Sequence, residues 1–370
     1  MKTVKIAMIG VGCISGIYLD NITKVFKEIE LIGVCDLVRE RAENAQKNYG
    51  VPKIYETMHD AFADPEVDIV LNLTRPYEHF EVTKAALEAG KHVYSEKPLG
   101  ASLEEGIQLR ALAEEKGLML GGAPDTFLGA GIQTCRRLID DGFIGQPIGS
   151  AAYMIGSGHE SWHPDPEFYY KYGGGPMFDM GPYYLTAMIN LLGGVSEVMS
   201  ASKITFPQRI ITSQPLAGTV IDVDVSTYVA GTVKYDNGAI GTIFTTFDVK
   251  FPREISRFIE VYGTEGTLFV PDPNCFGGPV RLFRPEDGTL REVPLMYDYP
   301  ENSRALGLAD MAKAIATGRE ARCDYRQTFH VLEIIEGFET SSREGRWVKM
   351  QSHYDRKPPM RKNPLKGILD

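Results

Sequence analysis

Short apolar runs alternate with amphipathic stretches along the first third of the chain. The apolar runs, which are typical of buried strands, span residues 4–9, 31–35, 68–73, 92–95 and 118–121. The stretches between them repeat apolar residues at helical spacing, over residues 14–25, 39–48, 81–88 and 103–115. Gly90 follows the third of these as a C-terminal stop. This alternation predicts a parallel sheet with helices on both faces.

The pattern changes after about residue 123, where alternating apolar and polar positions predominate. Predicted strands span residues 225–235, 239–247, 258–262, 267–270 and 280–283, and the first two flank a turn at Asp236-Asn237-Gly238. Helical spacing is confined to residues 131–141, 183–192, 304–317 and 325–343. This predicts a second region built on an antiparallel sheet with few helices.

These patterns divide the 370 residues into two domains and a tail. We expect one α/β domain over residues 1–122, a strand-rich second domain over residues 123–350, and a polar tail over residues 351–370. The tail is expected to be exposed or to lie on a partner subunit.

The composition limits the classes of partner and compartment. A net charge of -10 at pH 7 argues against binding of nucleic acid or an anionic membrane, because both are polyanions. The five cysteines are odd in number and form no C-x-x-C pair, which favours reduced thiols in the cytoplasm over disulfides or structural zinc. No segment approaches the roughly 20 apolar residues that a membrane-spanning helix needs.

A glycine motif stands where the first predicted strand leads into the first helix, at Gly10-Val11-Gly12-Cys13-Ile14-Ser15. Gly10 permits a tight turn, and Gly12 lets the backbone approach a pyrophosphate. The N-terminus of the helix offers free amides and a partial positive charge. Short glycine patterns also occur in ordinary turns, but the place of this one in the first βα unit favours dinucleotide binding.

Asp36 ends the second predicted strand, where a carboxylate can accept hydrogen bonds from both ribose hydroxyls of a dinucleotide. A carboxylate there also repels a 2′-phosphate, so the sequence favours NAD over NADP. Arg39 and Arg41 lie just downstream and weaken that preference.

Further motifs follow in order: Thr74-Arg75-Pro76-Tyr77-Glu78-His79, Gly90-Lys91-His92-Val93, Glu96-Lys97-Pro98 and Gly173-Gly174-Gly175-Pro176-Met177-Phe178-Asp179-Met180-Gly181-Pro182-Tyr183. With the glycine motif and Asp36, they resemble the glucose–fructose oxidoreductase and inositol dehydrogenase family (Gfo/Idh/MocA) up to about residue 346. The resemblance implies an N-terminal Rossmann dinucleotide-binding domain and a C-terminal α/β domain with a large, mostly antiparallel open sheet. That sheet often joins subunits, which implies a homodimer or homotetramer.

The resemblance also implies which residues form the cofactor site. Lys97 would lie beside the nicotinamide, and the Lys97–Pro98 bond would be able to adopt the cis form. The residues implied to contact NAD are Gly10, Gly12, Cys13, Ile14, Asp36, Thr74, Pro76, His79, Glu96 and Lys97. His79 is better explained as structural or cofactor-adjacent than as a base.

Lys97, Asp179 and Tyr183 are the catalytic candidates. Hydride transfer from a carbinol carbon requires loss of the hydroxyl proton, and Tyr183, which replaces the His of many relatives, is the acid–base candidate. A free phenol titrates near pH ~10, so we expect the ammonium of Lys97 to lower its pKa. Asp179 would fix a substrate hydroxyl. Alternatively, Asp179 is an ordinary helix-terminal carboxylate and Tyr183 a packing residue.

A second cluster, Gly158-His159-Glu160-Ser161-Trp162-His163-Pro164-Asp165, combines hydrogen-bonding and aromatic side chains, as sugar sites do. The candidate substrate-binding residues are Asp125, His159, Trp162 and His163. Two His and two acids also allow a metal site, but their spacing matches no strong zinc signature, so no metal is predicted.

The sequence therefore predicts a NAD-dependent oxidoreductase that transfers a hydride between nicotinamide and a hydroxyl or carbonyl carbon of a sugar, polyol or sugar derivative. Two alternatives stay open. One is a glycosidase of the same family that uses bound NAD in a transient redox step. The other is a non-catalytic nucleotide sensor, which the presence of Lys97 and Tyr183 disfavours.

Overall fold

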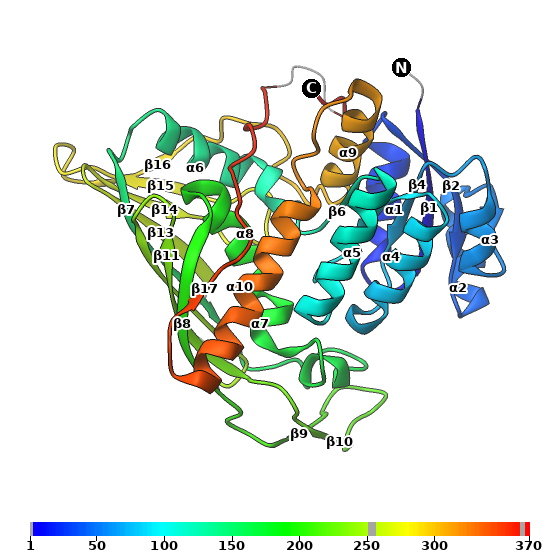
Figure 1. Ribbon diagram of the computed structural model, residues 1–370, viewed down its shortest axis with the longest axis horizontal. Helices are drawn as coiled ribbons and strands as arrows, with labels where there is room; N and C mark the ends of the chain where they lie inside the picture. Colours follow the sequence, from blue (N-terminus) through cyan, green and yellow to red (C-terminus); the bar gives the residue numbers. More distant parts are fainter. Residues whose placement is uncertain (1–2, 251–256, 363–366) are drawn as a thin grey trace.

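Two sheets and the helices around them make up the protein in the computed structural model (Figure 1), which describes residues 3–250, 257–362 and 367–370. A six-stranded sheet lies in the N-terminal third, and a nine-stranded sheet lies in the rest of the chain. The α/β fold class predicted from the sequence is confirmed. No helix among the described residues is long and apolar enough to cross a membrane.

The N-terminal sheet is parallel, with the strand order β3-β2-β1-β4-β5-β6. Its strands are β1 (Val4–Ile9), β2 (Ile29–Cys35), β3 (Lys53–Ile54), β4 (Ile69–Asn72), β5 (His92–Ser95) and β6 (Leu120–Gly122). Its helices are α1 (Ser15–Lys24), α2 (Arg39–Tyr49), α3 (Met58–Ala63), α4 (His79–Glu88) and α5 (Leu103–Lys116). The strand order reverses between β1 and β4, where the loops diverge and leave room for a ligand at the carboxyl ends.

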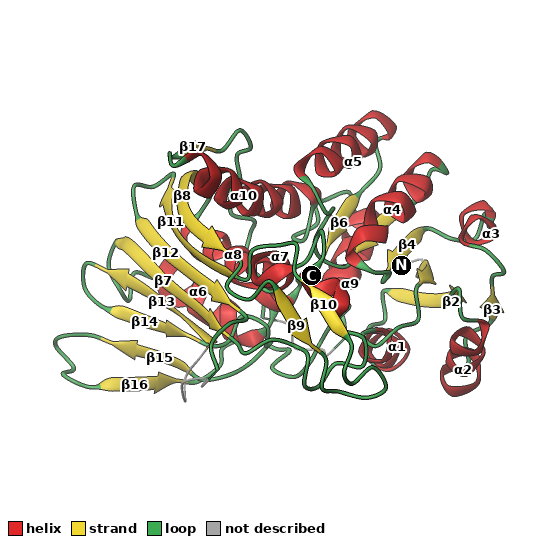
Figure 2. Ribbon diagram, turned by 90° about the horizontal axis from the view of Figure 1, so that it is seen from below, coloured by secondary structure: helices red, strands yellow, loops and turns green. Residues whose placement is uncertain are grey.

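Burial explains why these strands lack polar alternation. Helices α1 and α2 lie on one side of the sheet, and α3, α4 and α5 lie on the other (Figure 2). Ile6, Ala7 and Met8 in the centre of β1 are consequently fully buried. A parallel sheet covered on both faces needs near-continuous apolar strands of this kind.

The larger sheet has the order β16-β15-β14-β13-β7-β12-β11-β8-β17 and is antiparallel except at the β7–β12 pair. Its strands are β7 (Pro147–Ile155), β8 (Val195–Lys203), β11 (Tyr228–Tyr235), β12 (Ile240–Thr246), β13 (Arg257–Gly263), β14 (Thr267–Val270), β15 (Val280–Phe283), β16 (Leu290–Val293) and β17 (Val348–Lys349). A separate two-stranded ribbon consists of β9 (Gln208–Ile210) and β10 (Val220–Asp222).

One face of this sheet carries helices and the other does not. The remaining helices are α6 (Ala130–Asp140), α7 (Gly175–Asp179), α8 (Gly181–Leu192), α9 (Leu306–Thr317) and α10 (Tyr325–Glu344), and all but α9 pack directly on the sheet. No helix of the described chain covers the opposite face (Figure 2). In β12, Gly241 and Ile243 are accordingly buried, whereas Ile240 and Thr242 are exposed.

Each predicted strand and helix is present, with ends shifted by a few residues. The helices and strands that the sequence did not reveal are β3, α3, β7, α7, β8, β16, β17 and the β9–β10 ribbon. In β7, small residues interrupt the apolar pattern and Pro147 opens the strand. In β8, serines occupy alternate positions, which leaves too few large apolar residues to mark a strand.

The C-terminal tail differs from its prediction, because it packs on its own chain. Tyr354, Met360 and Leu369 are buried. The amide of Leu369 donates to the carboxylate of Glu28, 2.6 Å away, next to β2. The backbone carbonyl of the same Glu28 accepts the amide of Val4, 2.9 Å away, so the end of the tail lies beside the start of β1. The tail is therefore held on its own chain at these residues, whereas other described tail residues, such as Gln351 and Arg356, are exposed.

Candidate active site

Gly10 and Gly12 of the glycine motif differ in what surrounds them, and so in why glycine suits each position. Gly10 has φ +91°, and a Cβ there would lie 2.8 Å from the carbonyl of Leu73, so the fold itself requires glycine. A Cβ on Gly12 would meet nothing within 4 Å. The space beside Gly12 is therefore available to a ligand, which fits the close approach of a pyrophosphate to the backbone.

The helix that follows offers donors to an anion. Helix α1 begins at Ser15 with no side-chain cap and no acidic residue in its first turn. The hydroxyl of Ser15 donates to the carbonyl of Gly12, 2.7 Å away, and so does not occupy the helix amides. An uncapped helix N-terminus carries partial positive charge that stabilises phosphate.

Asp36 stands beside this loop, as predicted. Its carboxylate accepts hydrogen bonds from the amides of Val11 (2.7 Å) and Val38 (2.8 Å). The two arginines that weakened the preference for NAD are directed to acids: Arg39 pairs with glutamates, and a guanidinium nitrogen of Arg41 lies 3.8 Å from Asp36. The residues present therefore fit NAD better than a dinucleotide with a 2′-phosphate.

His79 joins two loops at the carboxyl edge of the sheet. Its Nδ1 lies 2.8 Å from the carbonyl oxygen of Pro98, and its Nε2 lies 3.1 Å from that of Thr74. The ring is buried, and burial lowers its pKa. This placement supports the structural explanation: His79 holds the loop after β4 against the loop after β5 and does not face open space.

Lys97 follows β5 and precedes a cis peptide bond to Pro98. Its Nζ lies 2.8 Å from Oδ1 of Asp179 and 2.6 Å from the backbone carbonyl of that residue. Burial by itself would lower the pKa of Lys97, but the charges of Asp179 and Glu96 and the nearby Tyr183 raise it above its ordinary value. Lys97 is therefore held as an ammonium.

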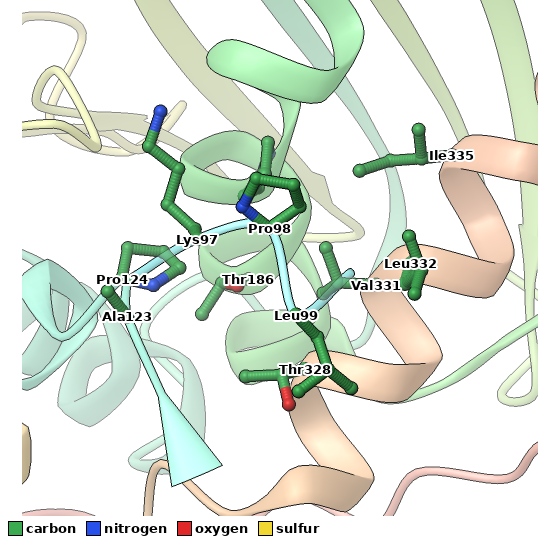
Figure 3. A pocket seen from close by; sticks show the side chains of 11 residues that line it. Lys97, Pro98, Leu99, Ala123, Pro124, Thr186, Thr328, Val331, Leu332 and Ile335 are labelled. Atoms are coloured by element: carbon green, nitrogen blue, oxygen red, sulfur yellow. The ribbon is translucent and has the colours of Figure 1, made fainter. Parts of the chain in front are cut away.

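The other side of the Lys97–Leu99 loop is closed. Figure 3 shows the Lys97 side chain extending away from the side chains of α10, whereas Leu99 points toward them. The space between this loop, α8 and α10 is a cavity of about 10 Å³, no larger than one water molecule. A substrate therefore cannot reach Lys97 through this space.

Tyr183 lies in the first turn of α8, and the Nζ of Lys97 is 5.3 Å from the centre of its ring. Burial raises the pKa of the phenol, and the charge of Lys97 opposes that shift without cancelling it. Lys97 therefore acts on this pKa in the expected direction, but the net shift in the protein without ligands is upward. The desolvation of the phenol outweighs the attraction of the ammonium.

Three of the four predicted substrate residues gather near this pair. The ring of His159 stacks on Tyr169 at 3.7 Å between centroids, and its Nε2 lies 3.6 Å from Oδ2 of Asp179. Burial lowers the pKa of His159 to about 4, so the ring is neutral near pH 7. Trp162 is 61% exposed, and its ring centroid lies 5.3 Å from that of His159. The ring centroids of His163 and Tyr169 are 5.4 Å apart.

Asp125 is the exception. It is buried, its carboxylate accepts a hydrogen bond from the amide of Gly307 at 3.0 Å, and burial raises its pKa to about 6. The prediction that Asp125 contacts the substrate is corrected: its carboxylate anchors the start of α9. Within the described ranges, no group of three or more His, Cys, Asp or Glu residues could hold a metal ion.

Two residues of the site were missed. Tyr169 lies in a 3₁₀ turn over Glu167–Tyr170 and forms the stacking partner of His159. Arg304 comes from the segment before α9, and its charge acts to lower the pKa of Tyr183. The aromatic run 168–170 was a usable signal for Tyr169, whereas nothing in the local sequence indicates Arg304.

Comparisons with known proteins agree with this geometry. Residues 4–122 match a family described as an oxidoreductase family with a NAD-binding Rossmann fold, and residues 132–269 match the GFO/IDH/MocA C-terminal domain. The chain is 28% identical over 268 residues to the scyllo-inositol 2-dehydrogenase (NAD(+)) of Bacillus subtilis (strain 168), covering 72% of this chain and 73% of that protein.

Two further proteins are similar over more of the chain. The D-xylose dehydrogenase of Paenarthrobacter nicotinovorans is 27% identical over 340 residues, covering 87% of this chain and 86% of that protein. The solved structure of a levoglucosan dehydrogenase, in its apo form, has a TM-score of 0.83 at 20% identity and covers 95% of this chain and 100% of its own. At that identity the structure shows a shared fold.

Proposed function

This chain belongs to the GFO/IDH/MocA family of NAD-dependent oxidoreductases, and we propose that it oxidises a hydroxyl of a sugar or polyol, or reduces the matching carbonyl. The observation that carries the proposal is the meeting of Lys97, Asp179 and Tyr183, from separate loops and helices, at the carboxyl edge of the parallel sheet. The named activities of the inositol and xylose dehydrogenase relatives support this substrate class.

The chain's own residues would hold the cofactor at one end of this site. The pyrophosphate would lie over Gly12 and the N-terminus of α1, and a ribose would face Asp36. NAD, when bound, supplies the hydride acceptor in oxidation and the hydride donor in reduction. Cys13 and Ile14 form the turn between Gly12 and the helix, while Thr74, Pro76 and Glu96 lie on the loops that His79 joins.

Proton transfer falls to Tyr183 in this proposal. The ammonium of Lys97 would bind the substrate oxygen and stabilise it as an alkoxide, so that the hydroxyl proton passes to the Tyr183 phenolate in oxidation and returns from the phenol in reduction. Asp179 holds that ammonium in place at 2.8 Å. Its second oxygen, near His159, would accept a hydrogen bond from a neighbouring substrate hydroxyl.

Sugar-like substrates suit the wall that faces this pair. His159, Trp162 and Tyr169 form an aromatic cluster with neutral hydrogen-bonding groups. Aromatic faces pack on the apolar C–H faces of sugar rings, while a few polar groups fix orientation. Nδ1 of His159 is buried and has no hydrogen-bond partner within the described chain, so a substrate hydroxyl would satisfy it.

A screen of inositols, pentoses, hexoses and anhydro-sugars, followed by the absorbance of NADH, tests the proposal. We expect one class to be oxidised with NAD in preference to NADP, and Lys97→Met to lose that activity. Lys47→Met, at an exposed position on α2, is the matched control and should retain it. Cleavage of a glycoside without net NADH would instead favour the redox-assisted glycosidase.

We also propose that copies of the chain assemble through the uncovered face of the large sheet. This face contains a hollow of about 310 Å³ that Tyr153, Ala230, Thr232, Thr242 and Phe244 help to line. Exposed apolar side chains such as Met199 and Ile240 extend the same face. Exposed apolar patches of this kind often mark contacts between protein chains.

A further inference from the structure

The loop that carries the predicted substrate residues rests on the β9–β10 ribbon, which lies outside both sheets (Figure 1). Residues 158–165 form this substrate loop. The backbone carbonyl of Glu160 accepts the amides of Thr212 (2.9 Å) and Ser213 (3.0 Å), which follow β9. The hydroxyl of Ser213 donates to the carbonyl of His163, 2.5 Å away. The ribbon therefore holds the backbone of the substrate loop at two points.

Arg209, in the middle of β9, joins the substrate loop to the large sheet. Its side chain is 6% exposed, and its Nη1 donates to Oε1 of Glu160, 2.8 Å away. Its Nη2 donates to the carboxylate of Asp248 and to the backbone carbonyl of Phe247, the latter at 3.2 Å. Asp248 also accepts the hydroxyl of Thr227, which precedes β11, at 2.8 Å. An isolated two-stranded ribbon has little stability of its own, so these contacts give it an anchor.

The same guanidinium lies next to the groups that pack on His159. One face of the His159 ring stacks on Tyr169. The guanidinium lies over the ring of the next residue, Tyr170, 5.3 Å from its centre. Phe247, whose carbonyl Arg209 binds, meets the His159 ring in a T-shaped contact at 4.6 Å between centroids. Arg209 therefore supports the surroundings of His159 from two sides.

The hydroxyl of Tyr170 completes the connection to His159. It donates to Oε2 of Glu160 at 2.7 Å and accepts the backbone amide of His159 at 3.2 Å. Glu160 thus uses one carboxylate oxygen for Arg209 and the other for Tyr170. The result is a continuous series of hydrogen bonds from the guanidinium to the backbone of His159.

This network fixes His159 in the candidate active site. Its Nε2 lies 3.6 Å from Oδ2 of Asp179, and its buried Nδ1 has no hydrogen-bond partner within the described chain. A side chain binds a ligand more tightly when its position is already fixed, because less conformational freedom is lost on binding. A support that holds His159 before the substrate arrives should therefore strengthen substrate binding.

The charges of the network make it sensitive to the loss of Arg209. One guanidinium lies between the carboxylates of Glu160 and Asp248, and the three side chains are at most 13% exposed. Inside a protein, a charge that has lost its partner is costly. Without Arg209, we expect the two carboxylates to separate and the substrate loop to move away from Asp248 into water.

We propose that Arg209 is the positioning residue of the substrate loop: it fixes His159 so that its unpartnered Nδ1 meets a hydroxyl of the sugar or polyol. This role rests on the proposed function of His159 as a substrate-binding residue, and it extends the site to the β9–β10 ribbon. Arg209 acts on substrate binding more than on hydride or proton transfer, because Lys97, Asp179 and Tyr183 are held by other contacts.

Tryptophan fluorescence tests the position of the loop without a substrate. The chain has two tryptophans, and Trp347→Phe leaves Trp162, in the substrate loop, as the reporter. In this background we expect Arg209→Gln to lower the fluorescence anisotropy and to increase quenching by acrylamide, because a released loop moves more freely and is more exposed. Arg209→Lys keeps the charge but lacks the second terminal nitrogen of the guanidinium, and should fall between.

Kinetics with a substrate that the protein oxidises give the second test. Arg209→Gln should raise KM by about tenfold, the worth of one hydrogen bond to the substrate, while kcat changes by less than about threefold. Partial unfolding would instead lower kcat through loss of active protein and leave KM unchanged. The rise in KM should be smaller in a His159→Gln background, where the group that Arg209 positions is already missing.

Arg322 offers a matched control, because it is a similarly buried arginine between two carboxylates. Its side chain is 7% exposed, and its guanidinium nitrogens lie 2.6 Å from Asp310 and 2.8 Å from Asp370. Arg322→Gln should lower the temperature of thermal unfolding but change neither KM nor the fluorescence of Trp162.

The results distinguish the role of Arg209 from the proposed function. Unchanged anisotropy and quenching in folded Arg209→Gln, an unchanged KM, or an equal rise of KM in Arg322→Gln overturns that role. If Arg209→Gln does not fold, Arg209→Lys is measured in its place and the same results decide. A released loop in a protein that oxidises no sugar or polyol supports the anchoring of the loop by Arg209 and overturns only the proposed function.

Discussion

The ammonium of Lys97 lies 2.8 Å from the carboxylate of Asp179, although Lys97 follows a strand of the parallel sheet and Asp179 ends a helix on the larger sheet. Both side chains are 15% exposed. A buried ion pair is costly to break, because removing one partner strands the other charge, typically at roughly 3–5 kcal/mol. The pair therefore couples the two sheets and fixes a positive charge where a substrate oxygen would bind.

Replacing Tyr183 by Phe tests the acid–base role that this pair supports. Tyr183→Phe removes one hydroxyl, and we expect kcat to fall by about 10²–10⁴-fold, the usual worth of a positioned general acid or base. The adjacent Tyr184 is a matched control, because it is equally buried and its hydroxyl has no hydrogen-bond partner within the described residues. Tyr184→Phe should keep near-normal kcat.

Steady-state kinetics and thermal unfolding of both variants complete the comparison. Near-normal turnover in folded Tyr183→Phe would remove the phenol from the mechanism. An equal loss in the two variants would point to helix packing instead of proton transfer.

The fold was largely predictable because strict patterns mark its elements. The buried strands of a doubly covered sheet need continuous apolar runs, and the five strands other than β3 are visible as such. β7 and β8 escaped because their stability comes from pairing with strands that lie far away in sequence. The path of the tail was also hidden, since Tyr354 and Met360 are isolated apolar residues in a polar segment.

The site was predictable where a motif fixes the chemistry. Lys97, Asp179 and His159 come together as their motifs indicated. Asp125 was misassigned because a buried carboxylate and a substrate-facing one look alike in sequence. Arg304 could not be found from the sequence, because its place depends on a backbone carbonyl that Asn21 holds from the other end of the chain.

Substitutions of Gly10 and Gly12 should have different effects, which measurements of stability and of NADH binding can check. Gly10→Ala places a Cβ against the Leu73 carbonyl at positive φ, so we expect a loss of about 2 kcal/mol or more in the free energy of unfolding. A Cβ at Gly12 meets nothing within 4 Å, so Gly12→Val should leave stability nearly unchanged while weakening NADH binding at least about tenfold. Denaturant unfolding and calorimetry measure the two quantities. Normal NADH affinity in Gly12→Val would show that the pyrophosphate does not cross this glycine.

Acid should destabilise the protein through buried histidines. His330 accepts the amide of Val195 at Nε2 and contacts Ser352 at Nδ1, and burial lowers its pKa from 6.5 to about 4. Between pH 4 and pH 6.5, the unfolded chain therefore binds a proton at His330 more readily than the folded protein does. The stabilisation is complete above pH 6.5 and is lost as the pH falls toward 4, by about 3 kcal/mol for one such group.

Denaturant unfolding at several pH values tests this assignment with His330→Gln as the comparison. The variant should be less stable at neutral pH and should lose less stability on acidification than wild type. Identical pH dependence in both proteins would assign the effect to other groups, such as His159, whose pKa burial also lowers to about 4.

A charge placed on the uncovered face of the large sheet should dissociate the proposed assembly. Thr242 lines its hollow, and Thr242→Arg would place a guanidinium where a second copy has to exclude water, so we expect the assembly to dissociate while each chain stays folded. Ile210→Arg changes a residue that is also exposed, but on the β9–β10 ribbon, and should leave the assembly intact. Light scattering coupled to gel filtration measures the mass of each. A wild-type protein that elutes as a monomer, or a Thr242→Arg variant that keeps its full mass, would show that this face does not join subunits.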